Sequence, residues 1–249
     1  MTDLLRAISA EHLKLKNTLA IRLALAGPVL LVLLHIGIYL TRGEMLEDHD
    51  GHRLEGFARG IMTTWTLLFF PLWVALATAL IASIDHRENH WDHLFALPIG
   101  RQSLYAAKWF VAAELTVLGS LAIPILGIAG AILLKAVHPD WRGEPLPAAM
   151  LFVDILRNSV AALLLLSIQF WLSLRWRSFV LPLAVGVGGI LSAVVVIQAP
   201  MKYLIIYPWT TSAAAASPTH PVLALAWGLV GGLALVAAAC SSLARRDEI

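Results

Sequence analysis

Residues 61–84 read IMTTWTLLFFPLWVALATALIASI, a stretch of 24 residues that contains no charged side chain. About 20 mostly apolar residues, wound as an α-helix, cross the hydrocarbon core of a bilayer, which is about 30 Å thick. This stretch therefore predicts a membrane-spanning helix.

The composition of the whole chain has the same character. Of its 249 residues, 59% are hydrophobic and only 14% are charged, and the mean hydropathy is +0.78. A soluble domain normally has about 25% charged and about 45–50% apolar residues. The composition therefore excludes a soluble globular enzyme and a disordered chain. The net charge of +2, without a run of basic residues, also gives no basis for a nucleic-acid partner.

Five further stretches meet the same length requirement. They predict an all-α, polytopic membrane protein that forms one transmembrane domain over residues 1–249 and has the lipid bilayer as its first partner. The six predicted spans cover approximately residues 19–40, 61–84, 106–134, 150–174, 179–199 and 221–244. The fourth contains Asp154 and Arg157, which are three residues apart and can neutralise each other near the headgroups.

The distribution of lysine and arginine predicts the orientation. An even number of spans places both termini on one side of the membrane. Eleven lysines and arginines lie in the terminal segments and connections of that side, against six on the other, and Arg157 lies inside a span. The positive-inside rule therefore predicts cytoplasmic termini. Trp141 and Trp209 then fall in outer connections, where we expect them on the membrane surface.

Residues 3–16 can form a short amphipathic helix ahead of the first span. Four apolar side chains share one of its faces: Leu4, Leu5, Ile8 and Leu15. Arg6 and Lys14 lie on the other face, toward anionic headgroups or a partner. The alternative is a flank that only sets the orientation of the first span.

The connection between the second and third spans, residues 85–108, predicts a compact helical elbow on the cytoplasmic side. Its residues are compatible with a helix up to Leu97, Pro98 then ends that helix, and a new one begins near Arg101. Exposed charge combined with Trp91 and Leu94 suits docking to a protein.

His86, His90 and His93 recur in this elbow with the spacing of one helix face. Histidines at i and i+4 converge on one metal ion, so a metal-dependent membrane enzyme is the alternative function. The other histidines form no further clusters of the kind that membrane di-iron enzymes use, so polar interface residues are the preferred interpretation.

The elbow resembles that of the ABC-2 type permeases, in particular the bacitracin-resistance and lantibiotic-immunity subfamily. The resemblance rests on these positions: Glu88, Trp91, Leu97, Pro98, Ile99, Arg101, Tyr105 and Lys108. Glu11 and Lys14 before the first span, and Arg245, Arg246 and Asp247 after the last, are also similar to the family.

The resemblance implies the membrane subunit of an ATP-driven exporter in a bacterial inner membrane. The elbow would be a coupling helix that contacts the ATPase subunit through Glu88, Trp91, Leu94, Pro98 and Arg101. Tyr105 and Lys108 would anchor the start of the third span. The chain has no Gly-x-x-x-x-Gly-Lys-Ser/Thr loop, so we expect no cofactor of its own and ATP bound by the separate ATPase. Because one six-span unit has no twin to enclose a pathway, we also expect a second permease copy or a sister permease.

Polar groups within the predicted spans are candidates for a substrate path, because a charge at the bilayer centre costs about 2.5–3.5 kcal/mol or more. The candidates are His35, Glu114, Asp154, Arg157, Asn158 and Gln169. Each of them has a structural alternative, an interhelical hydrogen bond or an interfacial position. By analogy with the family, residues 200–208 would form a short re-entrant helix.

The sequence therefore favours a non-catalytic transport subunit that exports a hydrophobic or amphipathic peptide or antibiotic, as in self-immunity or resistance. Export of a small ion or a lipid-like compound stays open. The rivals are the metal-dependent enzyme and a membrane scaffold without transport activity.

Overall fold

The computed structural model describes residues 2–16, 18–42, 52–87, 100–176, 178–217 and 220–245. Every regular element in these ranges is a helix and none is a strand, which confirms the all-α prediction. In chain order the elements are α1 (Thr2–Leu15), α2 (Leu19–Arg42), α3 (Arg53–Thr64), the π-helix η2 (Trp65–Phe69), α4 (Phe70–Arg87), α6 (Arg101–Val137), the 3₁₀ turn η3 (Pro139–Trp141), α7 (Ala148–Ala161), α8 (Leu163–Arg175), α9 (Val180–Val196), α10 (Met201–Ile206), α11 (Thr211–Ala216) and α12 (Pro221–Ala244).

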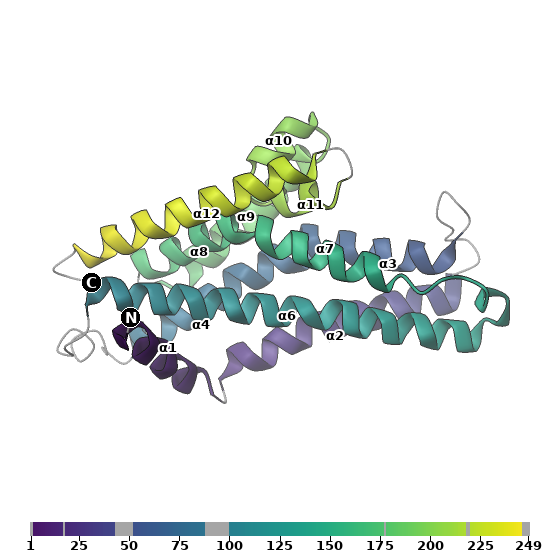
Figure 1. Cartoon of the computed structure of the whole chain (residues 1–249), viewed down its shortest axis with the longest axis horizontal. Helices are drawn as coiled ribbons and strands as arrows, with labels where there is room; N and C mark the ends of the chain where they lie inside the picture. Colours follow the sequence, from purple (N-terminus) through teal and green to yellow (C-terminus); the bar gives the residue numbers. More distant parts are fainter. Residues whose placement is uncertain are drawn as a thin grey trace.

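The long helices form a bundle (Figure 1). Helix α6 contacts α1, α2, α7 and α12, while α4 packs against α8 and α9. The start of α1 and the end of α12 lie at the same end of the bundle, where α4 also ends and α6 begins (Figure 1). We call this end the elbow end, because residues 88–99 connect α4 to α6.

Three helices in the described ranges are long and apolar enough to cross a membrane. They cover Arg53–Asp85, Arg101–Val137 and Pro221–Ala244. Helices α7 and α8 meet the requirement only as a pair, bent by 46°, and two shorter apolar helices cover Ala26–Arg42 and Val180–Val196. The described part thus contains three or four candidate spans by length and composition, and the six-span layout stays a prediction.

The helix that contains the 61–84 stretch begins eight residues earlier than that stretch, at Arg53. The added part, residues 53–60 of α3, is amphipathic: Leu54, Phe57 and Ala58 are buried. Glu55 and Arg59 form an ion pair of 2.6 Å on the exposed side. A hydropathy window omits such a segment, because the window averages the charged face with the apolar one.

Helix α6 is the longest element, at 37 residues, or about 55 Å at 1.5 Å per residue. Its charge-free part, residues 115–134, is about 30 Å long and matches the hydrocarbon core of a bilayer. Glu114 and Lys135 flank this part. This match predicts that residues 101–114 lie beyond the core at the elbow end.

Helix α12 lies unusually close to the junction between α7 and α8. A Cβ atom on Gly228 would lie 2.2 Å from the backbone oxygen of Ala161, and one on Gly232 would lie 2.6 Å from the backbone carbon of Leu163. The hydroxyl of Ser167 donates a hydrogen bond of 2.9 Å to the carbonyl oxygen of Gly232. Small residues therefore let α12 brace the bend between the two helices.

Two expectations for the outer connections are wrong. Trp141 is fully buried, stacks on His138 with a centroid distance of 4.2 Å, and lies beneath the guanidinium of Arg53. Trp209 is also buried, because its indole fills the space that Gly189 leaves without a side chain. Residues 201–206 do form a short helix, α10, and nothing in the structure tests whether it enters the membrane.

The close approach of α12 leads to a prediction on stability. Gly228→Ala forces a methyl group against the Ala161 backbone and should destabilise the fold by about 1–3 kcal/mol, the usual cost of overpacking. The thermal unfolding midpoint in detergent measures this. Gly188→Ala is the matched control, because a Cβ atom there meets nothing within 4 Å. An equal midpoint for both variants would contradict the close contact.

Candidate functional site

Part of the predicted coupling segment lies outside the described residues. This applies to Glu88, Trp91, Leu94 and Pro98, so their coupling roles stay predictions. The proposed metal ligands His90 and His93 also lie outside, and the side chain of His86 is not described. In the described ranges, no group of three or more histidine, cysteine, aspartate or glutamate residues could hold a metal ion.

Four charged residues meet at the elbow end, and we call them the charge cluster: Glu11, Lys14, Asp85 and Lys108. The Lys108 ammonium donates to the Glu11 carboxylate over 2.8 Å and to the Asp85 carboxylate. The Lys14 ammonium donates to the same two carboxylates, each over 2.9 Å. The cluster therefore joins α1, α4 and α6 through alternating charges.

The charge cluster is largely buried and electrically balanced. The side chains of Asp85 and Lys108 are fully buried, and that of Glu11 is 6% exposed. Two cations face two anions, which is the arrangement that makes buried charge tolerable, since an unpaired ion would keep its whole desolvation cost. Asp85 was absent from the predicted site residues. The only feature of the sequence that points to Asp85 as a site residue is the position of this carboxylate at the end of an apolar helix.

Helix α1 packs on α6 through a face that matches the predicted apolar face only in part: Ile8 and Leu15 pack inward, whereas Leu4 and Leu5 are exposed. Ala7, Glu11 and Leu15 point inward, and Ala7 contacts Leu104 and Ala107 of α6. The expectation that Lys14 faces headgroups is wrong, because the carboxylates of Asp85 and Glu11 draw its ammonium inward.

The outer side of α1 mixes apolar and polar side chains: Leu5 is 62% and Leu13 is 71% exposed, and Arg6, Ser9 and Lys16 are exposed beside them. This helix therefore has one face that completes the charge cluster and another that suits contact with lipid.

The surroundings of Lys14 keep it charged. Partial burial acts to lower its pKa, but the carboxylates of Glu11 and Asp85 outweigh burial and hold the pKa of Lys14 above its ordinary value of 10.5. A raised folded-state pKa gives stability that is fully present below the unfolded value and is lost only as the pH rises through the folded value. Docking of α1 therefore loses nothing through Lys14 at neutral pH.

The other predicted coupling residues lie at the start of α6. Arg101 is its first residue and is half-buried. Tyr105 is fully buried in a cluster with Phe170, Leu174 and Leu243. The Tyr105 ring therefore fixes the start of α6 to α8 and α12 from inside the bundle.

The predicted substrate-path residues lie in separate environments. His35 on α2 is buried, and its Nδ1 lies 3.0 Å from the carbonyl oxygen of Leu31. Asp154 and Arg157 on α7 lie 3.9 Å apart, as expected from their spacing. Asp154 also lines a pocket of about 220 Å³ between α3, η2, α7 and α11, together with Arg59.

Two amides in the predicted path, Asn158 on α7 and Gln169 on α8, are fully buried. Within the described ranges, no polar atom of either side chain has a hydrogen-bond partner. A Cβ atom on Gly186 would lie 3.3 Å from the Gln169 amide nitrogen, so this amide faces α9. The structure thus does not join the candidates into one path.

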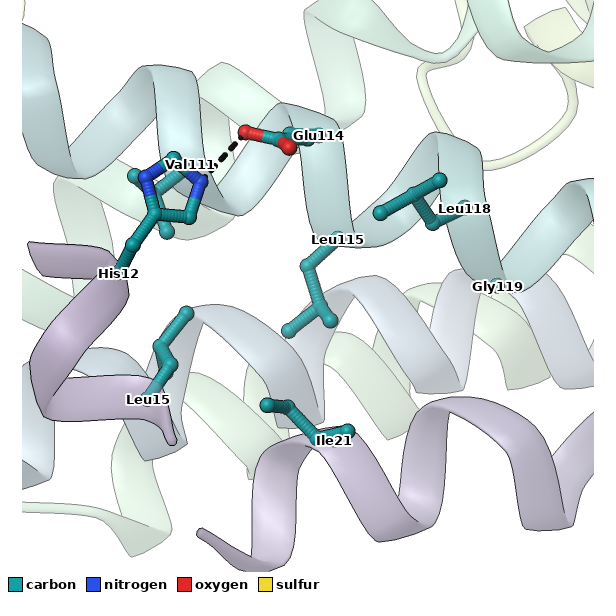
Figure 2. Close-up of a pocket in the computed structure, with 8 residues that line it drawn as sticks. All are labelled: His12, Leu15, Ile21, Val111, Glu114, Leu115, Leu118 and Gly119. Atoms are coloured by element: carbon teal, nitrogen blue, oxygen red, sulfur yellow. Dashed lines mark hydrogen bonds and ion pairs between the residues drawn. The ribbon is translucent and has the colours of Figure 1, made fainter. Parts of the chain in front are cut away.

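Glu114, the remaining candidate, borders a cavity of about 290 Å³ that we call the α1–α6 groove. Its described lining comprises His12, Leu15, Ile21, Val111, Glu114, Leu115, Leu118 and Gly119. Figure 2 shows His12 and Glu114 facing each other at one side of the groove. Their Nε2 and Oε2 atoms lie 2.7 Å apart. Apart from this pair the lining is apolar.

The family of the chain follows from its sequence. The sequence model of the ABC-2 family transporter proteins matches residues 7–193, three quarters of the chain. The chain belongs to the ABC-2 transporter family. The matched region contains the charge cluster and the α1–α6 groove, whereas α10, α11 and α12 lie beyond it. No curated protein and no solved structure gives a significant match.

Family membership fixes the general role. This ABC-2 protein is a multi-pass membrane permease subunit of an ABC transporter, and such permeases typically work with an ATPase subunit. It is a transport subunit rather than a catalytic enzyme, so the metal-dependent enzyme is not favoured. The match does not distinguish the bacitracin and lantibiotic subfamily.

Replacing Lys108 tests the charge cluster of this permease. Lys108→Met leaves Glu11 and Asp85 with Lys14 as their common counter-ion, and breaking a buried pair in this way costs about 3–5 kcal/mol. The thermal unfolding midpoint in detergent should fall accordingly. Lys108→Met combined with Asp85→Asn restores the balance and should recover most of the loss. Lys202→Met, at an exposed lysine, should change little. Unfolding of Lys108→Met at the wild-type temperature would disprove the pairing.

Proposed function

We propose that this permease is the membrane subunit of an ATP-driven exporter in a bacterial inner membrane, with both termini in the cytoplasm and residues 88–99 docked to the ATPase. The location of the α1 start and the α12 end at one end of the bundle is compatible with this orientation (Figure 1). The excess of lysine and arginine on that side supports it.

The charge cluster is the observation that carries the proposal. The segment expected to receive force from the ATPase, residues 88–99, begins after α4 ends at Arg87, two residues past Asp85. It is followed by α6, which begins at Arg101, seven residues before Lys108. The ammonium of Lys108 binds the Asp85 carboxylate and also donates to the Glu11 carboxylate of α1. A displacement of the segment would therefore act on three helices together, because separating them would expose unpaired buried charges.

The energy source in this proposal lies outside the chain. ATP binds the separate ATPase, and the permease holds no cofactor of its own. A second copy of the permease, or a sister permease, completes the membrane part. Glu88, Trp91, Leu94, Pro98 and Arg101 contact the ATPase, while Tyr105 and Lys108 transmit its movement into α6. The burial of Tyr105 and Lys108 supports that last step.

The cargo in this proposal is a hydrophobic or amphipathic peptide or antibiotic, exported in self-immunity or resistance. Two observations support an amphipathic cargo. Glu114 and Asp154 each border a cavity, one toward the elbow end and the other on α7. Both cavities place a carboxylate beside apolar side chains, and the cavity on α7 also contains the guanidinium of Arg59. Such a mixed lining suits a molecule that has a polar and an apolar part.

Purification from the native membrane tests the coupling role. An ATPase with a phosphate-binding loop should co-purify with the tagged permease in mild detergent. Trp91→Ala or Arg101→Glu should lower its recovery about tenfold or more, because aromatic and arginine residues at the centre of an interface carry much of the binding free energy.

Arg142→Glu is the matched control for Arg101→Glu. Arg142 is exposed between η3 and α7, at the opposite end of α6, so its charge reversal should leave ATPase recovery unchanged. Unchanged recovery for both Trp91→Ala and Arg101→Glu would exclude the coupling role. A stoichiometric metal ion that is lost in His90→Ala would instead support the metal-dependent enzyme.

A further inference from the structure

The α1–α6 groove has a polar side and an apolar floor. Glu114 is the last charged residue before the charge-free part of α6, so the carboxylate lies at the edge of the predicted hydrocarbon core. From Glu114 the lining continues along α6 through Leu115 and Leu118 to Gly119, about 7 Å deeper along the helix axis. The groove therefore runs from the headgroup level into the apolar layer.

The groove is open toward the surroundings of the bundle. Ile21 and Leu118 line it and are 39% and 56% exposed. Figure 2 shows the side chains of Leu15, Ile21 and Leu115 converging from α1, α2 and α6 on the space beside the His12–Glu114 pair. A molecule dissolved in this leaflet thus reaches the groove sideways, without crossing the bundle.

The charge of the groove is that of Glu114. No lysine or arginine belongs to its described lining, and Lys16 and Arg22, on either side of the turn between α1 and α2, are exposed outside it. The partner of Glu114 is the imidazole of His12, not a lysine or an arginine. Glu114 is the only carboxylate in the described lining.

We propose that the α1–α6 groove binds an amphipathic cation from the surrounding leaflet, with the ammonium of the ligand on Glu114 and its apolar part along Leu115 and Leu118. This inference rests on the proposed export function and narrows its cargo to amphipaths that carry an amine. The ligand ammonium takes the place of His12 beside the carboxylate. His12 satisfies Glu114 while the groove is empty.

Photo-crosslinking tests the inference in the full-length permease, reconstituted into phosphatidylcholine vesicles. Three probes share one alkyl chain with a photoreactive diazirine and differ only in the head: a trimethylammonium, a sulfonate or a hydroxyl group. Mass spectrometry measures the labelling of residues 111–119. We expect the ammonium probe to label this segment about two- to fivefold more than the hydroxyl probe, the size of one partly exposed ion pair.

Two variants distinguish binding of the probe's head group from binding of its alkyl chain. Glu114→Gln keeps the size of the side chain and should abolish the preference for the ammonium probe, whereas Leu118→Trp should reduce labelling by all three probes. Asp140→Asn, which removes an exposed carboxylate at the far end of α6, is the control and should change nothing.

A sulfonate probe that labels as strongly as the ammonium probe would overturn the inference, and so would an ammonium preference that survives in Glu114→Gln. ATPase recovery with Glu114→Gln tells the two proposals apart. If the ATPase still co-purifies while the probes show no head-group preference, the groove inference is wrong and the export function stands. If no ATPase co-purifies even with the unaltered permease, the proposed function itself is wrong.

Discussion

Three buried charges and one partly buried charge set the main constraint on this permease. An ion removed from water costs several kcal/mol unless opposite charges and hydrogen bonds replace its hydration. Glu11, Lys14, Asp85 and Lys108 meet that condition only while α1, α4 and α6 keep their mutual positions. The cluster consequently favours one arrangement of three helices at the elbow end. Such pairing gives specificity more than net stability, since a well-packed apolar core would hold the helices equally well.

Elsewhere the bundle depends on close packing rather than on charge. Outward side chains such as Leu30, Leu191 and Val230 are exposed and apolar, so they suit lipid and provide little drive for association between helices. Small residues supply the contact instead. Gly228 and Gly232 bring α12 against the α7–α8 junction, and Gly189 receives Trp209. The elbow end is therefore held by ion pairs, whereas the rest of the bundle is held by close packing of helix backbones at glycines.

Sequence reasoning succeeded where a feature depends on the chain itself. The last helix, Pro221–Ala244, coincides with its predicted range, because a charge-free run begins with a proline at the first turn. It failed where tertiary contacts decide. Nothing local to Lys14 shows that Asp85, 71 residues later, lies beside it. The space for Trp209 likewise exists only because α9 presents a glycine there. The same holds for the candidate site: a sequence motif can identify residues 88–108, but only the tertiary structure shows that α1 packs against the start of α6.

The π-helix η2 interrupts the long helix Arg53–Asp85, and its hydroxyl contacts are ordinary: Thr66 donates to the carbonyl oxygen of Met62 over 2.8 Å. A π turn holds one residue more than an α turn. Successive residues of an α-helix are about 100° apart, so that single extra residue resets the angular phase between α3 and α4. The buried face of α3 runs through Leu54, Phe57 and Ile61, and that of α4 runs through Val74, Ile81 and Asp85. Without the extra residue, these two faces would be rotated by about 100° relative to their present alignment. One inserted residue thus lets two differently phased halves share a single core.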